Sequence, residues 1–213
     1  MKNILITAGN TWSPIDDVRV ITNIFSGETG LNIAKQCAKK GFKVTLILAD
    51  LRSDIKLYFH KNIKIIRAIT FNELYETLKT EIKNKKYNYL IQAASISDFK
   101  VKQEVKGKIK SGFNMKLRLI PTKKIVNKIK KWDSEIKLIK FKLEAESSRK
   151  QLIQIAIKSK KESNADLVIA NNLPQPRGKH SFIIIKSRYE YVEVTGKKEL
   201  AKKITKICKK KTL

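Results

Sequence analysis

The first thirty residues contain the feature that most constrains the fold: an apolar strand, a long loop and a helix that starts beside glycines. Asn3–Thr7 is a short apolar run, which predicts a buried strand. Glu28–Lys40 has the spacing of an amphipathic helix, and Gly41 ends it. The loop between them is much longer than most strand-to-helix connections. Because long ordered loops tend to carry function, we expect this loop to hold part of a binding site.

The rest of the chain continues to alternate apolar strands with amphipathic helices. We expect further strands at Lys43–Leu48, Asn62–Ile69, Tyr89–Ala94, Met115–Ile120, Ile136–Leu143 and Asp166–Ala170. We expect helices at Phe71–Ile82, Thr122–Lys131, Ser147–Ser163 and Lys197–Lys210, a flap at Ser95–Gly112, and a C-terminal hairpin of Ser181–Lys186 and Tyr189–Val194. This order predicts an α/β, Rossmann-like fold with a doubly wound, mostly parallel sheet. No repeat or linker divides the 213 residues, so we expect a single domain over residues 1–213.

The chain is strongly basic, with a formal net charge of +28. Charge of this size suggests nucleic acid or another anionic partner. However, only seven of the 47 basic residues are Arg, and the lysines are scattered along the sequence. Proteins that read phosphates and bases usually rely on the bidentate guanidinium of Arg. We therefore expect no dedicated nucleic-acid binding, although the positive field would attract anionic substrates such as nucleoside triphosphates.

Small residues at the start of the first helix are suited to binding an anion. Ser26, Gly27 and Gly30 let backbone amides approach a phosphate, and the helix dipole favours negative charge there. The alternative is an ordinary helix start in which glycine allows tight packing. Neither a GxGxxG fingerprint nor a GxxxxGK[ST] loop occurs, so ordinary dinucleotide or P-loop chemistry is not supported.

Two polar groups in the loops are candidates for chemistry. Arg19 can clamp a phosphate or carboxylate, and the Asn23 amide can donate to a carbonyl, although most loop asparagines only stabilise turns. Lys108 and Lys110 lie in the flap after Asp98, where lysines can neutralise a triphosphate. In a chain with this much lysine, a solvated basic loop is the simpler interpretation of that segment.

Other classes of site and compartment are disfavoured. His60 and His180 lack metal-ligand spacing, so we expect no protein-held metal site. The sequence shows no apolar run of membrane-spanning length and no secretory leader, so we expect no membrane partner. Cys37 and Cys208 are far apart in sequence and read as free structural thiols, which predicts a cytoplasmic protein.

Four blocks, in order, resemble the phosphopantothenate–cysteine ligase (phosphopantothenoylcysteine synthetase) family. They are ITAGNTWSPIDDVRVITNIFSGETG, QAASISDFKVKQEVKGKIKSG, KFKLEAES and ADLVIANNL, and they span nearly the whole chain. The resemblance implies a modified Rossmann-like fold, usually dimeric, that uses CTP and Mg²⁺. It implies that the carboxylate of phosphopantothenate attacks the α-phosphate of CTP to give an acyl-cytidylate and pyrophosphate. The amine of L-cysteine then displaces CMP, a step of coenzyme A biosynthesis.

The resemblance also assigns roles to residues at matching positions. Asn23 matches the asparagine that handles the acyl-cytidylate, and Arg19 matches an arginine that supports the same loop. Lys108 and Lys110 match lysines of a KxKK motif that faces the triphosphate. The remaining nucleotide-binding positions implied are Gln92, Ala93, Ala94, Asp98, Lys123, Lys124, Ile125, Val126 and Phe141.

The chain departs from the family pattern at several of these places. Asn10 replaces a glycine, Phe25 a serine, Glu28 a lysine and Ser111 the last lysine of KxKK. The family's NPDI loop reads TKKI here. A flavin-dependent decarboxylase often precedes this ligase in one chain, so we expect a separate or fused phosphopantothenoylcysteine decarboxylase as a partner.

Two other functions stay open. The departures and the charge allow a non-catalytic nucleotide- or nucleic-acid-binding module on a degenerate ligase fold. A short-chain oxidoreductase shares the strand order, but the missing glycine fingerprint and the missing Tyr-xxx-Lys pair argue against it. The nucleotide is also open, since ATP can take the place of CTP in this chemistry.

Overall fold

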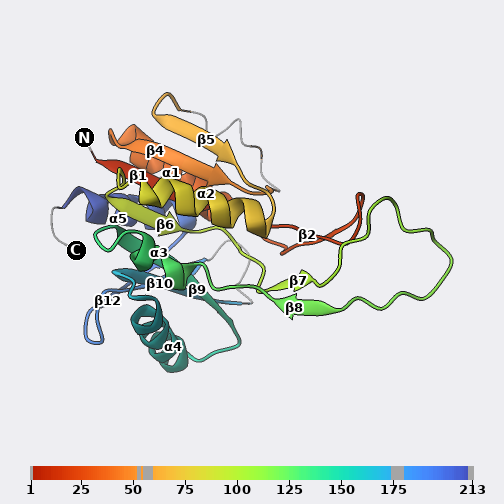
Figure 1. The fold of residues 1–213 in the computed structure, drawn as a ribbon. Helices are drawn as coiled ribbons and strands as arrows, with labels where there is room; N and C mark the ends of the chain where they lie inside the picture. The colour runs from red at the N-terminus through yellow and green to blue at the C-terminus, as the bar shows by residue number, and fades with distance from the viewer. Residues whose placement is uncertain (1, 52–53, 55–59, 174–179, 211–213) are drawn as a thin grey trace.

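A central eight-stranded sheet organises the protein, as a computed structural model shows (Figure 1). The structure describes residues 2–51, 54, 60–173 and 180–210. The strand order in the sheet is β12-β11-β10-β9-β6-β1-β4-β5. The parallel strands are β1 (Asn3–Ala8), β4 (Lys43–Leu48), β5 (Ile63–Arg67), β6 (Tyr89–Gln92), β9 (Lys137–Ala145) and β10 (Leu167–Leu173). An antiparallel hairpin, β11 (Ser181–Ile185) and β12 (Tyr191–Thr195), extends the sheet beyond β10.

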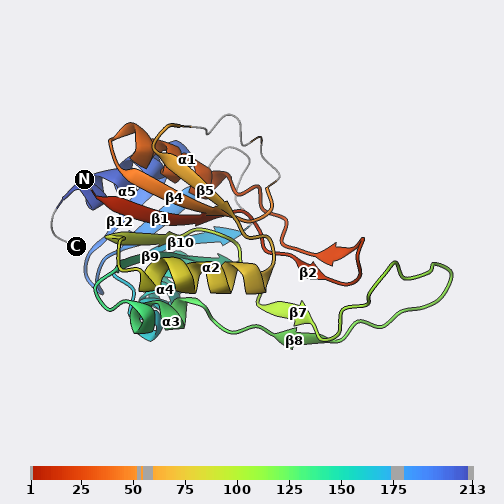
Figure 2. The same ribbon diagram turned by 45° about the horizontal axis from the view of Figure 1, so that its top comes forward.

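Helices cover both faces of this sheet (Figure 2). On one face, α1 (Glu28–Lys39) packs against α5 (Lys197–Lys209). The other face carries α2 (Phe71–Lys83), α3 (Val126–Trp132) and α4 (Arg149–Ser163). Thr70 and Ser148 begin α2 and α4 with capping boxes, which satisfy amides that the first helical turn leaves free. In the described part of the chain, no helix is both long and apolar enough to cross a membrane.

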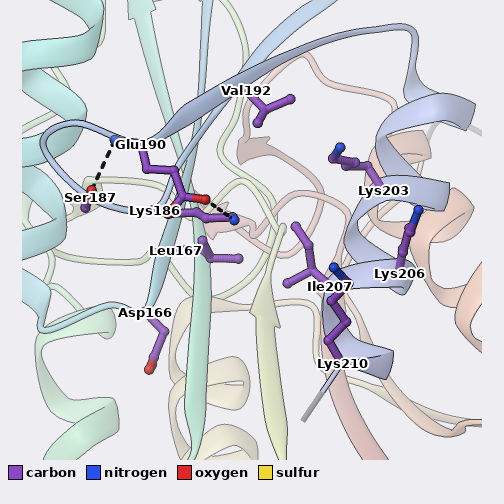
Figure 3. A pocket seen from close by; sticks show the side chains of 10 residues that line it. All are labelled: Asp166, Leu167, Lys186, Ser187, Glu190, Val192, Lys203, Lys206, Ile207 and Lys210. Carbon is purple, nitrogen blue, oxygen red and sulfur yellow. Dashed lines mark hydrogen bonds and ion pairs between the residues drawn. The ribbon is translucent and has the colours of Figure 1, made fainter. Parts of the chain in front are cut away.

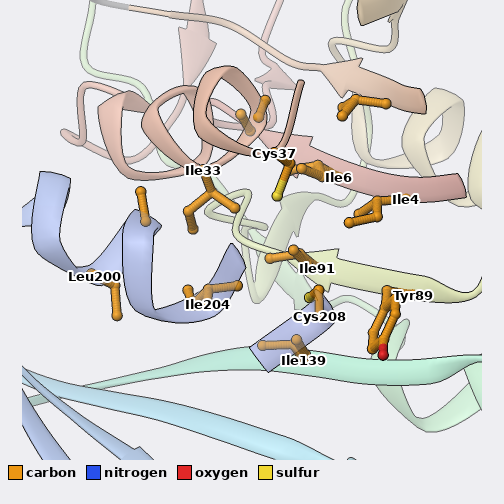
Figure 4. Packing of buried hydrophobic residues seen from close by; sticks show 14 of the residues in the cluster. Ile4, Ile6, Ile33, Cys37, Tyr89, Ile91, Ile139, Leu200, Ile204 and Cys208 are labelled. Carbon is orange, nitrogen blue, oxygen red and sulfur yellow. The ribbon is translucent and has the colours of Figure 1, made fainter. Parts of the chain in front are cut away.

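The core is divided into two layers by the sheet, because the central strands carry apolar side chains on both faces. Figure 4 shows the layer under α1 and α5, where Ile33 and Ile204 meet Ile91 of the sheet. Cys37 and Cys208 are buried in this layer as free thiols. Burial raises the pKa of the Cys37 thiol to about 11 and also raises the pKa of Cys208. Neither thiol is therefore a reactive thiolate near neutral pH.

Two short antiparallel ribbons project from the carboxyl edge of the sheet (Figures 1 and 2). One pairs β2 (Ser13–Pro14) with β3 (Val20–Ile21), and the other pairs β7 (Phe99–Val101) with β8 (Leu119–Pro121). The Val101 amide donates to Ser13 Oγ at 2.8 Å, which joins the two ribbons. We call residues 13–21 and 99–121 the arm.

The predicted doubly wound α/β fold is confirmed, and the predicted elements agree with the structure except in the arm and at α3. The strand predicted at Met115–Ile120 is wrong over most of its length, because pairing begins only at Leu119. The flap predicted at Ser95–Gly112 contains the short strand β7. The helix predicted from Thr122 begins at Val126, since Thr122 is used in hydrogen bonds to the loop after β6.

Candidate functional site

A cleft of about 900 Å³ opens at the carboxyl ends of β6, β9 and β10, beside the start of α1. This edge of an open parallel sheet is where ligands bind in α/β folds. The cleft collects residues from all four sequence blocks that carry the resemblance. Twelve of the predicted site residues line it: Asn23, Ser26, Gly27, Gln92, Ala93, Ala94, Asp98, Lys123, Lys124, Ile125, Val126 and Phe141.

Glycines are required where α1 meets β1. Gly27 has a φ of 77°, and a Cβ there would lie 2.3 Å from Leu51 Cδ2. Gly30 is buried, and its Cβ would lie 2.7 Å from Ala8 Cβ, so Gly30 supports the site from below rather than lining it. The N-cap residue Gly27 has no side chain to cap α1, the Glu28 amide donates to Ser26 Oγ at 3.4 Å, and all three residues line the cleft. Backbone amides in the first turn of a helix point outward, and with the helix dipole they suit an anionic group.

An ion pair that the sequence did not predict stands beside this helix start. Lys197, the first residue of α5, reaches Glu28 with 2.6 Å between Nζ and Oε2. The Lys197 hydrogen bond lowers the pKa of the Glu28 carboxyl, and the charge of His180 contributes in the same direction. Lys197 and His180 also line the cleft. More than 150 residues separate Glu28 from these two, so no local sequence pattern could have shown their contact.

Hydroxyl groups hold the two cleft loops together. Thr7 Oγ1 accepts from the Ala94 amide at 3.0 Å, and Thr11 Oγ1 accepts from the Ser97 amide at 2.9 Å. The Asn23 amide Nδ2 donates to Ser95 Oγ at 2.7 Å. These bonds fix Asn23 above the end of β6, with one of its two amide N–H groups left for a ligand.

Asn10 explains one departure from the family pattern. Its Nδ2 donates to the Phe25 carbonyl at 2.5 Å, and its backbone pairs with Asp50. Asn10 is almost fully buried, so a side chain takes the room that a glycine would leave. The contact ties the segment before Gly27 to the end of β1.

The side of the cleft near α3 carries both charge and apolar surface. Asp98 pairs with Lys124 at 2.5 Å, and both side chains are largely exposed. Thr122 Oγ1 donates to the Ser97 carbonyl at 2.7 Å, which attaches the segment before α3 to the loop after β6. Ile125 is buried and anchors the start of α3 in the core.

The arm carries three predicted site residues that lie outside the cleft: Arg19, Lys108 and Lys110. Asp16 organises this part. It accepts from the Ile109 amide at 3.0 Å and from the Arg19 guanidinium at 2.5 Å. The hydrogen bond from the Ile109 amide, with those from Val18 and Arg19, lowers the Asp16 pKa to about 2. Asp16 therefore holds the segment between Lys108 and Lys110 against the tip of the β2–β3 ribbon.

A second, smaller cavity of about 450 Å³ lies between the β11–β12 hairpin and α5 (Figure 3). It is at the opposite edge of the sheet, where β10 begins. Lys203 and Lys206 of α5, with Lys210 directly after the helix, surround an apolar floor. None of the predicted site residues lines this cavity, so we assign the candidate site to the larger cleft.

Comparison with known sequences shows which proteins this chain is similar to. Residues 1–211 match the model of the DNA/pantothenate metabolism flavoprotein C-terminal domain. The coenzyme A biosynthesis bifunctional protein CoaBC of Thermococcus kodakarensis is 34% identical over 98% of this chain and 48% of its own length. The protein of the same name from Methanocaldococcus jannaschii is 32% identical over 98% of this chain and 51% of its own. The chain thus spans about half the length of these relatives.

Solved structures share the fold. The DNA/pantothenate metabolism flavoprotein from Streptococcus pneumoniae superposes with a TM-score of 0.87 at 27% identity, over 98% of this chain and 99% of that one. A Cab2 mutant in complex with phosphopantothenate-cysteine superposes with a TM-score of 0.73 at 21% identity, over 98% of this chain and 89% of that one. The second similarity shows that the fold extends to a protein with that ligand bound.

Proposed function

The chain belongs to the family of the DNA/pantothenate metabolism flavoprotein C-terminal domain, and from this premise we propose that it is a phosphopantothenate–cysteine ligase. It would join phosphopantothenate to L-cysteine in coenzyme A biosynthesis. CTP activates the acid as an acyl-cytidylate with release of pyrophosphate, and the cysteine amine then displaces CMP. The observation that carries the proposal is one cleft in which twelve predicted residues meet, drawn from three of the four blocks and from the segment 123–126.

The chemistry of the cleft is suited to each reactant. The start of α1 offers backbone amides to the phosphate of the acid, and Lys197 beside it balances the charge of Glu28. Asn23 stands over the strand ends, where its free N–H can donate to the acyl oxygen as negative charge builds on it. Asp98 and the segment 122–126 provide polar and apolar contacts on the nucleotide side.

We propose Mg²⁺ as a cofactor that enters with the nucleotide. Three carboxylates that line the cleft are already paired with lysines, in Glu28–Lys197, Asp98–Lys124 and Glu144–Lys142. Within the described residues, no group of three or more His, Cys, Asp and Glu is placed to hold a metal. Triphosphate oxygens and water would therefore supply most of the Mg²⁺ ligands, which is how this ion is commonly bound. When bound, it neutralises charge on the leaving pyrophosphate.

We propose that the active form is a homodimer built through the arm. The arm projects from the sheet (Figure 1), and its residues Arg19, Lys108 and Lys110 do not line the cleft of their own subunit. It also exposes a set of large apolar side chains, Phe99, Val105, Phe113, Met115, Leu117 and Leu119. Apolar surface of this extent on a projecting arm fits a protein interface. In a symmetric dimer, each arm can deliver its lysines to the cleft of the partner subunit.

The chain matches only about half the length of relatives that are named bifunctional proteins, which supports one further partner. We propose that phosphopantothenoylcysteine decarboxylase acts on the product, as a separate protein or as a fused domain. A cytoplasmic location fits this chemistry, because Cys37 and Cys208 are free thiols.

The first test is pyrophosphate release by the purified protein with Mg²⁺, phosphopantothenate and cysteine, with CTP compared to ATP. We expect release with CTP that depends on phosphopantothenate, and amide formation only when cysteine is present. Pyrophosphate release with ATP alone would support the ligase activity but contradict CTP as the nucleotide. No release with either nucleotide, from folded protein, would favour the non-catalytic binding module.

Asn23 provides the sharper test of mechanism. Asn23→Asp removes the amide donor while keeping the size of the side chain. We expect pyrophosphate release to persist and amide formation to fall by about 100-fold, the usual cost of one oxyanion donor. Lys161→Met, an exposed change on α4 outside the cleft, serves as the control. Normal amide formation by Asn23→Asp would reject the role given to Asn23.

A further inference from the structure

Two buried polar side chains stand next to each other on the floor of the cleft. Gln92 of β6 and Lys140 of β9 are direct partners in the parallel register of these strands. They are only 5% and 6% exposed, and both line the cleft. Since Leu90 and Leu138 pack in the core layer of α2, α3 and α4, the residues two positions further on face the same layer.

The Gln92 carboxamide has no hydrogen-bond partner within the described parts of the chain. Both Nε2 and Oε1 are buried, and each lacks a partner there. Buried polar atoms in folded proteins nearly always have a partner, so this donor and this acceptor need a group that the chain itself does not supply. Because Gln92 lines the cleft, this donor and this acceptor are available to a group bound there.

Lys140 has a donor to spare. Its Nζ donates to the Ser159 carbonyl at 3.3 Å and to Ser163 Oγ at 3.1 Å, both on α4. An ammonium has three donors, so one remains beside Gln92. Burial lowers the Lys140 pKa to about 8, and the nearby charges of Lys142 and Lys124 act in the same direction, while Glu162 opposes them. At neutral pH the group is thus a poorly hydrated cation, which gains strongly from an acceptor.

We propose that Gln92 and Lys140 together read the edge of the nucleotide base and select a 2-oxopyrimidine over adenine. This inference rests on the proposed function and names the base specificity of that site. Cytosine presents an amino donor, a ring-nitrogen acceptor and a carbonyl acceptor along one edge. The amide oxygen and nitrogen of Gln92 match the first two, and the spare Lys140 donor matches the third.

Adenine offers the same amino group and ring nitrogen but a C–H where cytosine has its carbonyl. Bound in this place, adenine would satisfy Gln92 and leave the Lys140 donor facing a carbon. A site that leaves a buried polar group unpaired rejects the wrong ligand more strongly than one that only changes apolar contact. Lys140 is therefore the discriminating residue, and Gln92 is the residue that both bases share.

The test uses Lys140→Met, Gln92→Leu and the matched control Lys161→Met, which removes an exposed lysine of α4. Calorimetry measures the dissociation constants of CMP and AMP for each protein, and thermal melting checks that each is folded. We expect Lys140→Met to weaken CMP by roughly tenfold and to leave AMP nearly unchanged. Gln92→Leu should weaken both nucleotides, and Lys161→Met should change neither.

An unchanged CMP-to-AMP ratio in folded Lys140→Met would overturn the inference. If the wild type turns over CTP while that ratio stays constant, only the base-reading inference fails. If the nucleotides bind with the expected ratios but no pyrophosphate is released, the ligase proposal fails and the base-reading pair stands. Should Lys140→Met not fold, Lys140→Arg keeps the cation, and we expect it to retain the CMP preference.

Discussion

Gly30 shows how a single missing side chain sets the distance between α1 and the sheet. A Cβ at this position would lie 2.7 Å from Ala8 Cβ and 3.0 Å from the Thr7 carbonyl oxygen. We expect Gly30→Ala to lower the free energy of unfolding by about 1–3 kcal/mol, the usual cost of overpacking a core. Urea denaturation measures it, with Lys39→Ala at the exposed end of α1 as the control. Equal stability of Gly30→Ala and wild type would show that α1 can shift without cost.

Lys140 should leave a signature in the pH dependence of stability. Its pKa falls from 10.5 in the unfolded chain to about 8 in the fold, chiefly through burial. Between these values the unfolded chain binds the proton that the folded chain has released, so this group makes stability rise as pH rises. One pKa unit corresponds to about 1.4 kcal/mol, which gives an upper limit of about 3 kcal/mol.

The measurement is urea denaturation of wild type and Lys140→Met from pH 7 to pH 10. We expect the free energy of unfolding of wild type to increase relative to that of Lys140→Met as pH rises. The reason is that only the wild type loses the cost of burying an ammonium. Other lysines titrate in both proteins and cancel in the difference. Parallel stability profiles would contradict a depressed Lys140 pKa.

At the residue scale, the sequence indicates which glycine and which asparagine lie at the cleft, but it does not indicate the buried lysine. Gly27 and Asn23 occur in a long loop with a recognisable order of residues. Lys140 lies in a strand whose neighbouring positions are buried on both faces, so alternation gives no sign of its environment. In a chain with this many lysines, a functional lysine also has no compositional contrast.

At the element scale, the arm depends on acidic residues that tie its two ribbons together. Asp16 accepts the Ile109 amide, and Asp17 Oδ2 accepts the Gly107 amide at 3.0 Å. We expect Asp16→Asn to loosen the segment between Lys108 and Lys110, since a neutral amide accepts these bonds more weakly. Hydrogen exchange at the Ile109 amide should become at least about tenfold faster, as for a loss of roughly 1.4 kcal/mol of local protection.

Glu104→Gln offers the control for the arm, because Glu104 is an exposed acid in the same segment. In Glu104→Gln, hydrogen exchange at the Ile109 amide should match that of wild type.

The contact between Asp16 and the Ile109 amide is lost in acid, since the Asp16 carboxylate has a pKa near 2 in the fold and 3.8 in its ordinary state. Stability from this group is therefore present above pH 4 and disappears as pH falls through 2. Protection of Ile109 that survives at pH 2 would contradict the role of Asp16.

Helix and strand positions in the sheet could be predicted because apolar periodicity and capping agree there, as in α2 and α4. The arm could not, because its strands are two or three residues long and polar sequence surrounds them. Pairing there is set by contacts between segments about 90 residues apart, such as Val101 with Ser13.

At the scale of the whole molecule, the dimer proposal makes assembly and turnover inseparable. We expect Phe113→Asp with Leu119→Asp to convert the dimer to monomers in sedimentation velocity, since charges in an apolar interface are costly. Pyrophosphate release should fall by at least about 100-fold, while CMP binding stays within about twofold, because the cleft lies outside the arm. The control is Lys161→Met, which changes an exposed residue of α4 outside the arm. A fully active monomer would contradict the proposal.

The placement of cleft groups on both faces of the sheet has a consequence for substrate length. The start of α1 lies on one face of the sheet, and Gln92 with Lys140 faces the other. In the proposed reaction, the acid held by its phosphate and the nucleotide held by its base would approach the strand ends from opposite sides and meet above β6. The thickness of the sheet then sets the distance that the acid has to span. We expect an acid with a shorter chain between its phosphate and its carboxylate to bind at the start of α1 without reaching the nucleotide. Such an acid would be an inhibitor and not a substrate.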